Sequence, residues 1–374
     1  MGAVHQRLLR RGERIRVMVV DDSAVIRRMV TRALEQDPSL EVVGTAANGA
    51  IGLQRIPELN PDVVTLDIEM PEMNGLEMLH HLHRDHRMLR VIMLSTLTQH
   101  GAAITLEALT LGADDYVTKI SNQGSLTDAV ARLQEELVPK IKQFFRFLDL
   151  SGPSGERTPP AAPARPFRLE DLPALPGRRT RLRALVIGSS TGGPVALSGI
   201  LPKLPRDFPL PVLVVQHMPP LFTRLFAERL NSSCALSVQE ASQGSLVEPG
   251  TVLIAPGDFH MTVASSEGHV RVCLDQSPMQ NFCRPAVDAL FLSSAEVYGG
   301  DVLAVILTGM GHDGLHGAQV LKARGANILA QDEASSVVWG MPGAVVKAGI
   351  ADRILPLDGV GAEILRIAGE NGRL

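Results

Sequence analysis

The 374-residue chain has few cysteines and little net charge, and both shortages exclude classes of protein. Its three cysteines, Cys234, Cys273 and Cys283, lack the paired CxxC spacing of a zinc site. A sparse, odd number argues against a disulfide scaffold and predicts reduced cytoplasmic thiols packed in the core. The formal net charge of −4 is too weak for a nucleic-acid partner that binds through bulk electrostatics.

Long apolar runs are also missing. None approaches the roughly 18–20 residues of a membrane span, and the start of the chain lacks the hydrophobic stretch of a signal peptide. What is present is a 45% apolar composition, typical of a soluble globular protein. The length predicts two or three domains in a cytoplasmic protein.

One segment, residues 151–183, differs in composition from the rest. It contains seven prolines and seven arginines against three acidic residues, Glu156, Glu170 and Asp171. Such a sequence cannot bury enough apolar surface to offset its ordering entropy, so it behaves as a semi-rigid spacer. We therefore expect one domain over 15–137, the end of a helix and a linker over 138–182, and a second domain over 183–370.

Before the linker, strand and helix patterns alternate, which predicts a doubly wound (βα)5 α/β domain with a parallel sheet. Apolar runs of strand length lie at Arg16–Val20, Leu40–Gly44, Val63–Asp67, Val91–Ser95 and Asp115–Lys119. Helical spacing of apolar residues covers Ala24–Leu34, and a last helix is expected over about 125–148.

After the linker the alternation resumes and predicts a second α/β domain with a mainly parallel sheet. Strands are expected at Leu182–Ser189, Pro211–His217, Thr251–Ala255, Val270–Leu274, Val302–Thr308 and Asn327–Gln331. Helices are expected at Val195–Lys203, Leu221–Leu230, Pro285–Val297 and Leu315–Arg324. A few antiparallel strands are expected in the middle portion, about 234–275.

Charged residues gather at strand ends of the first domain. Asp21 and Asp22 end its first strand, Asp67 ends a later one, and Lys119 ends the last. Clustered carboxylates repel one another unless a cation lies among them, and Mg²⁺ prefers such oxygen ligands. A carboxylate held against Mg²⁺ can accept a phosphoryl group, whose oxygens Ser95 and Lys119 could bind. The alternative is that Asp21 and Asp22 only cap the following helix.

The three aspartates and Lys119 stand in the segments Val19–Ser23, Leu66–Gly75 and Gly112–Lys119. These segments resemble the receiver domain of two-component response regulators over roughly residues 15–137. The resemblance implies that a histidine kinase phosphorylates Asp67. It also implies a set of binding residues: Asp21, Asp22, Asp67 and the Glu69 carbonyl for Mg²⁺, with Ser95, Lys119 and the switch aromatic Tyr116 for the phosphoryl group.

Three apolar runs of the second domain end on residues of hydrolytic type. Ser190 lies in Gly188-Ser-Ser-Thr-Gly192, which matches the G-x-S-x-G turn, and His217 and Asp313 follow two other strands. A serine hydroxyl needs a base to take its proton, and the imidazole needs a carboxylate to fix its tautomer. Parallel sheets place functional groups at the carboxyl ends of strands, so a hydrolase is predicted. The Ser–His–Asp order excludes the α/β-hydrolase fold, whose order is Ser–Asp–His.

Each of these residues has an alternative interpretation. Ser189 is a rival nucleophile, a strand-end histidine such as His217 is commonly a packing residue, and Asp313 could cap a helix. His312 and His316 flank Asp313, but they would need a further ligand to make a metal site. The glycine-rich turn could bind phosphate, although it lacks the lysine of a P-loop. A response regulator with a non-enzymatic second domain is the other class, but no helix-turn-helix follows the linker.

The three residues belong to a longer set of segments: Ile187–Pro194, Gln216–Pro220, Ile254–Asp258 with His260, Arg284–Asp288, Leu307–Gly314 and Trp339–Pro342. Together they resemble the catalytic domain of the chemotaxis protein-glutamate methylesterase family (CheB type). The resemblance assigns Ser190 as nucleophile, His217 as general base and Asp313 as the carboxylate that orients it. It places Thr191 and Met310 near the oxyanion and the substrate.

The resemblance implies a hydrolase that demethylates glutamate γ-methyl esters on methyl-accepting chemotaxis receptors, releases methanol and deamidates receptor glutamines. It implies a histidine kinase as phosphodonor, receptors as substrates and no cofactor for the esterase. We expect a monomer that meets the membrane only through receptors. A receiver packed over the three strand ends would block receptor access until Asp67 is phosphorylated.

Overall fold

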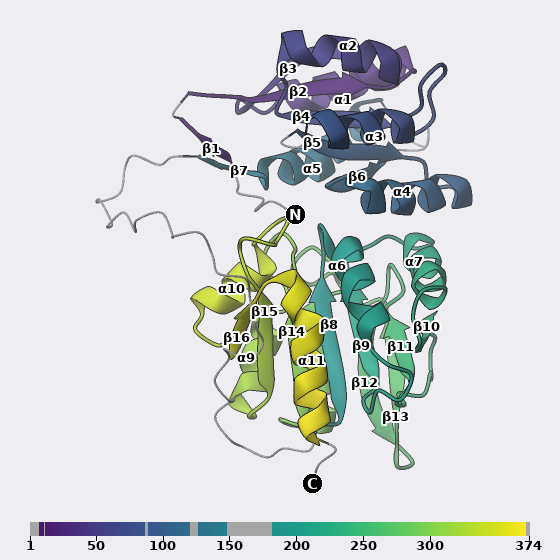
Figure 1. Cartoon of the computed structure of the whole chain (residues 1–374), viewed down its shortest axis with the longest axis vertical. Helices are drawn as coiled ribbons and strands as arrows, with labels where there is room; N and C mark the ends of the chain where they lie inside the picture. The colour runs from purple at the N-terminus through teal and green to yellow at the C-terminus, as the bar shows by residue number, and fades with distance from the viewer. Residues whose placement is uncertain (1–6, 11, 87–88, 120–125, 148–181, 372–374) are drawn as a thin grey trace. The chain divides into compact units, whose positions relative to one another are not determined.

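The computed structural model describes residues 7–10, 12–86, 89–119, 126–147 and 182–371, which form two units, each with its own sheet (Figure 1). The first unit ends at Phe147 in the described ranges, and the second begins at Leu182. Within these ranges no helix combines the length and the apolar character that a bilayer span requires.

The first unit is a five-stranded parallel sheet in the order β3-β2-β4-β5-β6. Its strands are β2 (Ile15–Val20), β3 (Leu40–Ala46), β4 (Val63–Asp67), β5 (Arg90–Ser95) and β6 (Asp115–Thr118). Its helices are α1 (Ala24–Glu35), α2 (Gly49–Leu59), α3 (Gly75–Asp85), α4 (Gln99–Leu111) and α5 (Leu126–Lys142). Helix α1 packs against α5, whereas α2, α3 and α4 pack in a row, the two layers of a doubly wound sheet. The predicted fold class is confirmed.

Polar caps fix where four of these helices begin. In each case a side-chain oxygen accepts a hydrogen bond from a backbone N–H of the first turn, which would otherwise lack a partner. The caps are Ser23, Asn48, Asn74 and Thr98. Because each cap follows directly on a strand-end loop, the loops that carry Asp21, Asp22 and Asp67 are tied to rigid elements.

The last helix of this unit is shorter than the sequence predicts. Helix α5 ends at Lys142 instead of near residue 148, and Phe145–Phe147 forms strand β7. Strand β7 pairs in parallel with β1 (Arg7–Leu9), in which Leu9 is fully buried. Residues 7–9, which lie outside the receiver-like segments, are therefore packed as part of the first unit. Local periodicity could not predict this pair, because each short strand is stabilised by a partner far away in the chain.

The second unit is a seven-stranded sheet in the order β10-β11-β9-β8-β14-β15-β16, and all six of its ladders are parallel. Its strands are β8 (Ala184–Ser189), β9 (Val212–Gln216), β10 (Ser237–Glu240), β11 (Thr251–Ile254), β14 (Val302–Ile306), β15 (Asn327–Gln331) and β16 (Arg353–Leu355). Strand β8 is central, with β9 on one side and β14 on the other. Strand order reverses at this point, where parallel α/β sheets bind their ligands.

The remaining elements of this unit are mostly helical. They are α6 (Gly193–Ile200), the 3₁₀ turn η2 (Leu201–Lys203), α7 (Phe222–Asn231), α8 (Val287–Tyr298), α9 (Leu315–Ala323), α10 (Met341–Lys347) and α11 (Leu357–Asn371). The antiparallel strands expected in the middle portion are the hairpin of β12 (His260–Ser266) and β13 (His269–Asp275). Strands β10 and β11 of the same portion are parallel members of the main sheet. The sequence interpretation missed α10 and β16, which are short, and also the 15-residue helix α11.

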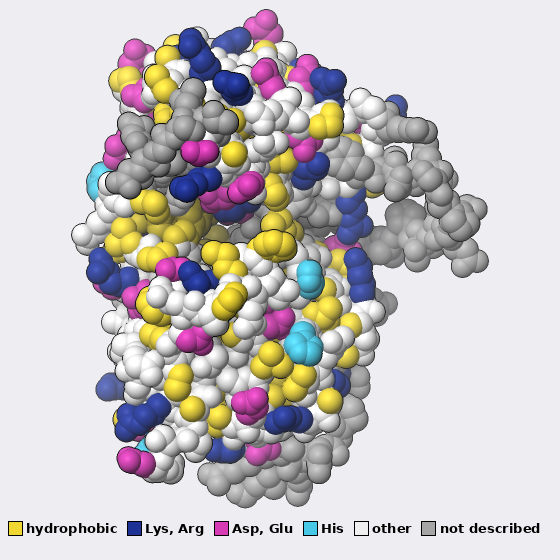
Figure 2. Space-filling model, turned by 180° about the vertical axis from the view of Figure 1, so that it is seen from behind, with side chains coloured by type: hydrophobic (Ala, Val, Ile, Leu, Met, Phe, Trp, Pro, Cys, Tyr) yellow, Lys and Arg dark blue, Asp and Glu magenta, His cyan; other side chains and the backbone are white. Residues whose placement is uncertain are grey.

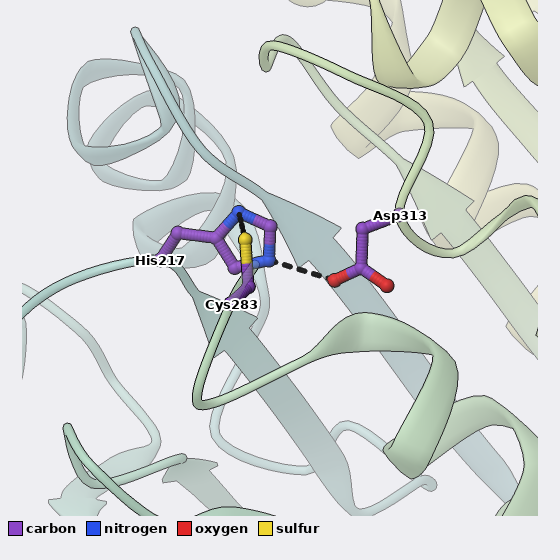
Figure 3. Close-up of side chains that lie close together, drawn as sticks. All are labelled: His217, Cys283 and Asp313. Carbon is purple, nitrogen blue, oxygen red and sulfur yellow. Dashed lines mark hydrogen bonds and ion pairs between the residues drawn. The ribbon is translucent and has the colours of Figure 1, made fainter. Parts of the chain in front are cut away.

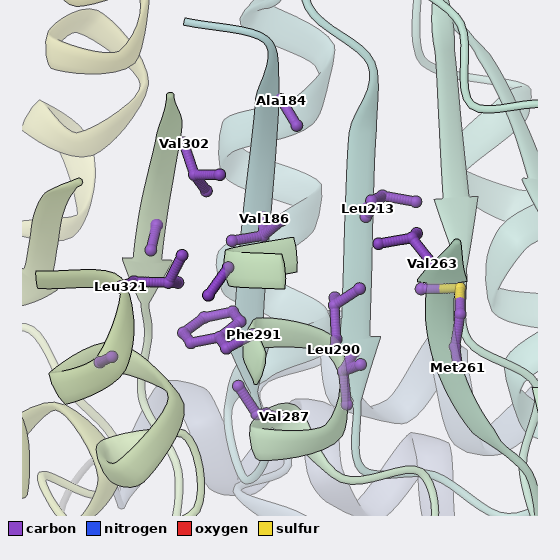
Figure 4. Close-up of a cluster of buried hydrophobic side chains, with 14 of the residues drawn as sticks. Ala184, Val186, Leu213, Met261, Val263, Val287, Leu290, Phe291, Val302 and Leu321 are labelled. Carbon is purple, nitrogen blue, oxygen red and sulfur yellow. The ribbon is translucent and has the colours of Figure 1, made fainter. Parts of the chain in front are cut away.

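Helix α8 packs tightly against the sheet through a buried apolar cluster (Figure 4). Its Val287, Leu290 and Phe291 lie against residues such as Val186 of β8. A Cβ atom at Gly188 would lie 2.4 Å from Val287 Cγ1, so only glycine permits this approach. The start of α8 is thereby held beside the carboxyl end of β8.

The surface drawn in Figure 2 has mixed charge. Lys and Arg side chains are interspersed with Asp and Glu among the described residues of this face. A duplex partner requires many clustered cations to displace its counterions. The face shown offers no such basic stripe within the coloured residues.

Candidate active site and acidic cluster

His217 and Asp313 come from different strand-end loops, and their side chains meet (Figure 3). Nε2 of His217 lies 2.8 Å from Oδ2 of Asp313, with the two side chains only 12% and 2% exposed. Burial lowers the pKa of His217, but the hydrogen bond to Asp313 and the contact with Cys283 outweigh it, so the pKa is raised. The pair therefore stabilises an imidazolium, the species that forms when a base takes a proton from serine.

Asp313 also caps a helix, though not the one that follows it in the chain. Its Oδ2 accepts from the backbone N–H of Val287 at 2.6 Å, and its Oδ1 accepts from that of Asp288 at 3.1 Å. The amide of Asn281 donates a further bond of 2.9 Å to Oδ1. Burial raises the pKa of Asp313, but the hydrogen bond and charge of His217, followed by these donors, lower it below its usual value. The start of α8 thus holds an ionised carboxylate in one orientation.

The two adjacent serines at the end of β8, Ser189 and Ser190, have different surroundings. Ser189 is fully buried, and its hydroxyl donates to Oε1 of Gln216 at 2.7 Å. Ser190 is partly exposed, and its backbone N–H donates to the carbonyl of Thr308 at 3.0 Å. Gly192 adopts a positive φ of 78° to begin α6. Of the two serines, Ser190 is the one whose surroundings leave room for a substrate.

Ser190 and His217 occupy neighbouring strand ends without touching through their side chains. The backbone N–H of His217 donates to the carbonyl of Ser189 at 3.1 Å, which fixes the two ends side by side. In the described part of the chain, no hydrogen bond links the Ser190 hydroxyl to the imidazole. Instead, Nδ1 of His217 lies 3.5 Å from Sγ of Cys283, so Asp313 and Cys283 engage both ring nitrogens (Figure 3). Catalytic hydrogen bonds commonly tighten only when substrate is bound.

Cys283 and Asn281 were not predicted as members of this site. The sequence interpretation placed the cysteines in the core, yet Cys234, Cys273 and Cys283 are all partly exposed free thiols. Residue type and spacing carry no signal for Cys283, because its position depends on the loop between β13 and α8.

Thr191 and the loop that leads to Met310 both lie next to Ser190. Thr191 follows it directly, and its carbonyl accepts from the hydroxyl of Thr308 at 2.9 Å. A Cβ at Gly309 would lie 2.8 Å from the Cβ of Ser190, so the loop before Met310 lies against the serine. The side chain of Met310 is 41% exposed, which is high for a methionine and suits a wall of a substrate site.

His312 and His316 are both exposed and are not part of the cluster around Asp313. Groups of potential metal ligands in the described ranges are His217 with Cys283 and Asp313, and Asp21 with Asp22 and Asp67. The alternative of a His312–Asp313–His316 metal site therefore receives no support.

The second cluster lies in the first unit, at the ends of β2 and β4. Ligand oxygens of Asp21, Asp22 and Asp67 lie within 4.8 Å of one another. Nζ of Lys119 bridges two of them, at 2.8 Å from Asp21 and 2.6 Å from Asp67. Burial raises the pKa of Asp67 to about 6, against the lowering effect of Lys119. Three convergent carboxylates with one cation fit a hard divalent metal, and in a receiver domain they indicate a divalent-metal site.

The remaining residues predicted for the receiver, Glu69, Ser95 and Tyr116, differ in exposure and in the groups that they contact. Glu69 and Asp22 line one open pocket next to the cluster. Ser95 is fully buried, and its hydroxyl accepts from that of Thr105 at 2.6 Å, a bond that faces α4. Tyr116 is buried beneath Lys140, whose Nζ lies 5.0 Å from the ring centre. The structure therefore brings Lys119 to Asp67, whereas the hydrogen bonds of the Ser95 hydroxyl go to Thr96, Gly101 and Thr105.

The two units together define a class of protein, a response regulator whose receiver is joined to an α/β enzyme domain. The family model of the response regulator receiver domain matches residues 17–131, and that of the CheB methylesterase matches 185–364. The chain is 50% identical to a protein-glutamate methylesterase/protein-glutamine glutaminase from a Nocardioides species, over 94% of this chain and 95% of that relative. It is 45% identical to one from Trichodesmium erythraeum, over 95% and 99%.

A solved structure, the CheB methylesterase catalytic domain of Thermotoga maritima, is 47% identical, with a TM-score of 0.49 over 50% of this chain and 98% of that chain. The identity to curated relatives extends over nearly the whole chain. The chain belongs to the CheB family of hydrolases, the protein-glutamate methylesterases/protein-glutamine glutaminases.

Proposed function

We propose that this protein hydrolyses glutamate γ-methyl esters on methyl-accepting chemotaxis receptors and deamidates specific receptor glutamines, with Ser190, His217 and Asp313 as its catalytic triad. The observation that carries the proposal is the 2.8 Å pair of His217 and Asp313 at the strand end beside Ser190. Free thiols throughout the described chain suit the cytoplasm, where receptors present these side chains.

The reaction is an acyl transfer. Oγ of Ser190 attacks the γ-carbonyl carbon while His217 takes the hydroxyl proton, and Asp313 stabilises the resulting imidazolium. Collapse of the tetrahedral intermediate breaks the bond to the methoxy oxygen, which leaves as methanol with the proton from His217. Water then attacks the acyl-enzyme by the same route and restores Ser190. Attack on an amide is identical except that ammonia leaves, which accounts for the glutaminase activity.

Activation requires that Nδ1 of His217 be released by Cys283, because Asp313 already engages Nε2. Backbone N–H groups of the turns around Thr191 and Met310 are the candidate donors to the oxyanion, each worth about 10²–10³ in rate. The exposed side chain of Met310 contributes apolar contact to the substrate.

The receiver is proposed to carry the control. A histidine kinase would transfer a phosphoryl group to Asp67, and Asp21, Asp22, Asp67 and the carbonyl of Glu69 would hold Mg²⁺. When bound, the ion would supply positive charge beside the transferring group. Lys119 already contacts Asp67 and would bind a phosphoryl oxygen, whereas Ser95 must break its bond to Thr105 to do so. Such a change in the receiver shifts the balance between inactive and active states.

The deciding experiment is methanol release from methylated receptor membranes by the full-length protein. Wild type should release methanol, and Ser190→Ala and His217→Gln should not, and Ser190→Ala should retain the wild-type thermal unfolding profile. Undiminished release by Ser190→Ala would overturn the triad. A phosphodonor should raise release by wild type but not by Asp67→Ala. If Asp67→Ala is not phosphorylated yet responds equally, the proposed control is wrong.

A further inference from the structure

Three side chains at the active site form a line of thiol, imidazole and carboxylate. Sγ of Cys283 lies 3.5 Å from Nδ1 of His217, and Nε2 of the same ring lies 2.8 Å from Asp313 (Figure 3). Cysteine hydrolases activate their nucleophile with the same order of groups, a histidine between a cysteine and a third, orienting residue. The triad assigned above has no use for Cys283, so the thiol is an additional nucleophilic group on the same base.

The loop that carries Cys283 holds the thiol in place. Two backbone bonds close a tight turn, from Gln280 N–H to Cys283 O at 3.1 Å and from Cys283 N–H to Gln280 O at 2.8 Å. Inside it, Asn281 and Phe282 both have positive φ, 51° and 62°, a backbone conformation that residues other than glycine rarely adopt. The bond from Asn281 to Asp313 secures this strained turn to the site. Strain that the surrounding structure maintains at a site points to function.

Cys283 is also accessible to small reagents. It is partly exposed, and its neighbour Phe282 is 98% exposed, so the turn lies at the surface. Reactive cysteines are partly exposed and lie beside a cationic group that stabilises the thiolate. The contacts of His217 raise its pKa, so the ring retains a proton taken from the thiol, and its positive charge stabilises the thiolate.

We propose that Cys283 is a modification site: His217 activates its thiol toward peroxides and alkylating electrophiles, and the modified sulfur removes His217 from hydrolysis. The three residues that build the site come from separate segments, so the arrangement is a product of the fold.

The chemistry balances with peroxide as the oxidant. His217 takes the thiol proton, and the thiolate attacks one oxygen of hydrogen peroxide. A sulfur–oxygen bond forms, the oxygen–oxygen bond breaks, and the departing hydroxide takes the proton from the imidazolium to become water. Sulfur is oxidised by two electrons to sulfenic acid, and peroxide is reduced by two. With iodoacetamide, a sulfur–carbon bond forms and iodide leaves.

Modification enlarges the group that lies against Nδ1 of His217. The ring then cannot accept the proton of Ser190, and hydrolysis stops until a thiol reduces the sulfenic acid. This consequence rests on the proposed role of His217 as general base, whereas the reactivity of Cys283 does not.

The first test measures reactivity without any enzyme assay. Full-length protein is treated with iodoacetamide at pH 7, and labelling at each cysteine is followed by mass spectrometry. Cys234 and Cys273 are matched controls, because both are partly exposed and burial raises the pKa of Cys234. An ordinary thiol is only a few per cent ionised at this pH, so Cys283 should react about tenfold faster than either control.

His217→Gln should abolish this difference. Equal rates at the three cysteines in wild type, or an unchanged difference in His217→Gln, would overturn the proposal even if the esterase assignment stands.

The second test measures inactivation as the activity that remains relative to the same untreated variant. Hydrogen peroxide should inactivate wild type and Cys273→Ala, and dithiothreitol should restore both. Cys283→Ala and Cys283→Ser should resist the treatment, and two variants guard against one that folds poorly. Peroxide inactivation of either Cys283 variant at the wild-type rate would contradict the proposal.

Discussion

Oδ2 of Asp313 lies 2.8 Å from Nε2 of His217 and at the same time accepts the backbone N–H of Val287 at 2.6 Å. One carboxylate therefore orients the candidate base and caps α8, so catalysis and local stability depend on the same atoms. Substitutions of this residue should separate the two roles.

Asp313→Asn should lower kcat for methanol release by about 10³–10⁴-fold, because the neutral amide no longer stabilises the imidazolium. Its remaining oxygen can still accept one of the two bonds from α8, so thermal stability should fall less than in Asp313→Ala. Asp313→Ala should lose the cap as well and cost about 1–2 kcal/mol in unfolding free energy. Thermal unfolding and release assays on both variants check this. Equal stability of the two would disprove the capping role.

Ser189→Ala and Ser190→Ala should have opposite effects. Ser189 donates to Gln216 in a fully buried position, so its loss should cost about 1 kcal/mol of stability while most activity remains. Ser190→Ala should abolish methanol release and leave unfolding unchanged. The two variants differ by one position in the same turn, so each serves as the control for the other. Loss of activity in Ser189→Ala alone would reassign the nucleophile.

The activity of the enzyme should rise with pH through the pKa of His217. The pKa of His217 in the folded protein is raised above its unfolded value of about 6.5. The contacts of the ring therefore stabilise the fold fully below that pH, and this stabilisation is lost as the pH rises through the pKa of the folded protein. Activity runs the opposite way, since the base must be neutral. Cys283 contributes to the raised pKa, so Cys283→Ala should shift the midpoint of kcat/KM downward, whereas Cys273→Ala should not. An unchanged midpoint in Cys283→Ala would contradict this assignment.

Mg²⁺ should stabilise the first unit through Asp22. This residue is exposed, and the ion pairs of Lys119 go to Asp21 and Asp67. Asp22→Asn should therefore unfold like wild type in the absence of metal. It should lose the rise in Tm that we expect for wild type with Mg²⁺, about 5–10 °C at about 100-fold excess over Kd. Thermal scans with and without EDTA test it. A full Mg²⁺ response in Asp22→Asn would exclude that carboxylate as a ligand.

Gly188→Ala should disturb the active site indirectly, by displacing helix α8. Its Cβ would lie 2.4 Å from Val287 Cγ1, so α8 must shift, at a cost of about 1–3 kcal/mol and with loss of activity. Gly199→Ala is the matched control, because no atom lies within 4 Å of its added Cβ and the residue is in helix α6. The unfolding free energy of that variant should rise by about 0.5–1 kcal/mol, and its activity should be unchanged. A Gly188→Ala protein as stable and active as wild type would show that α8 approaches less closely.

The fold class and the neighbourhood of His217 and Asp313 could be predicted because they follow from local signals. Apolar runs that end on functional residues fix the strands, and parallel sheets place their carboxyl ends on one edge. Cys283 could not be predicted, because its approach to His217 depends on the left-handed turn at Asn281 and Phe282. The identity of the helix that Asp313 caps could not be predicted either. The sequence suggested the helix that follows Asp313, whereas in the fold Asp313 caps α8.

The pairing of β1 with β7 determines how the two units can be separated or recombined. A receiver excised at residues 15–137 would omit both strands of this small sheet and expose the apolar contacts that Leu9 buries. A chimera that joins this receiver to another effector should therefore retain the segment from Arg7 through Phe147. For the same reason, an affinity tag fused directly before Arg7 would begin beside Phe145, the residue with which Arg7 pairs in this small sheet.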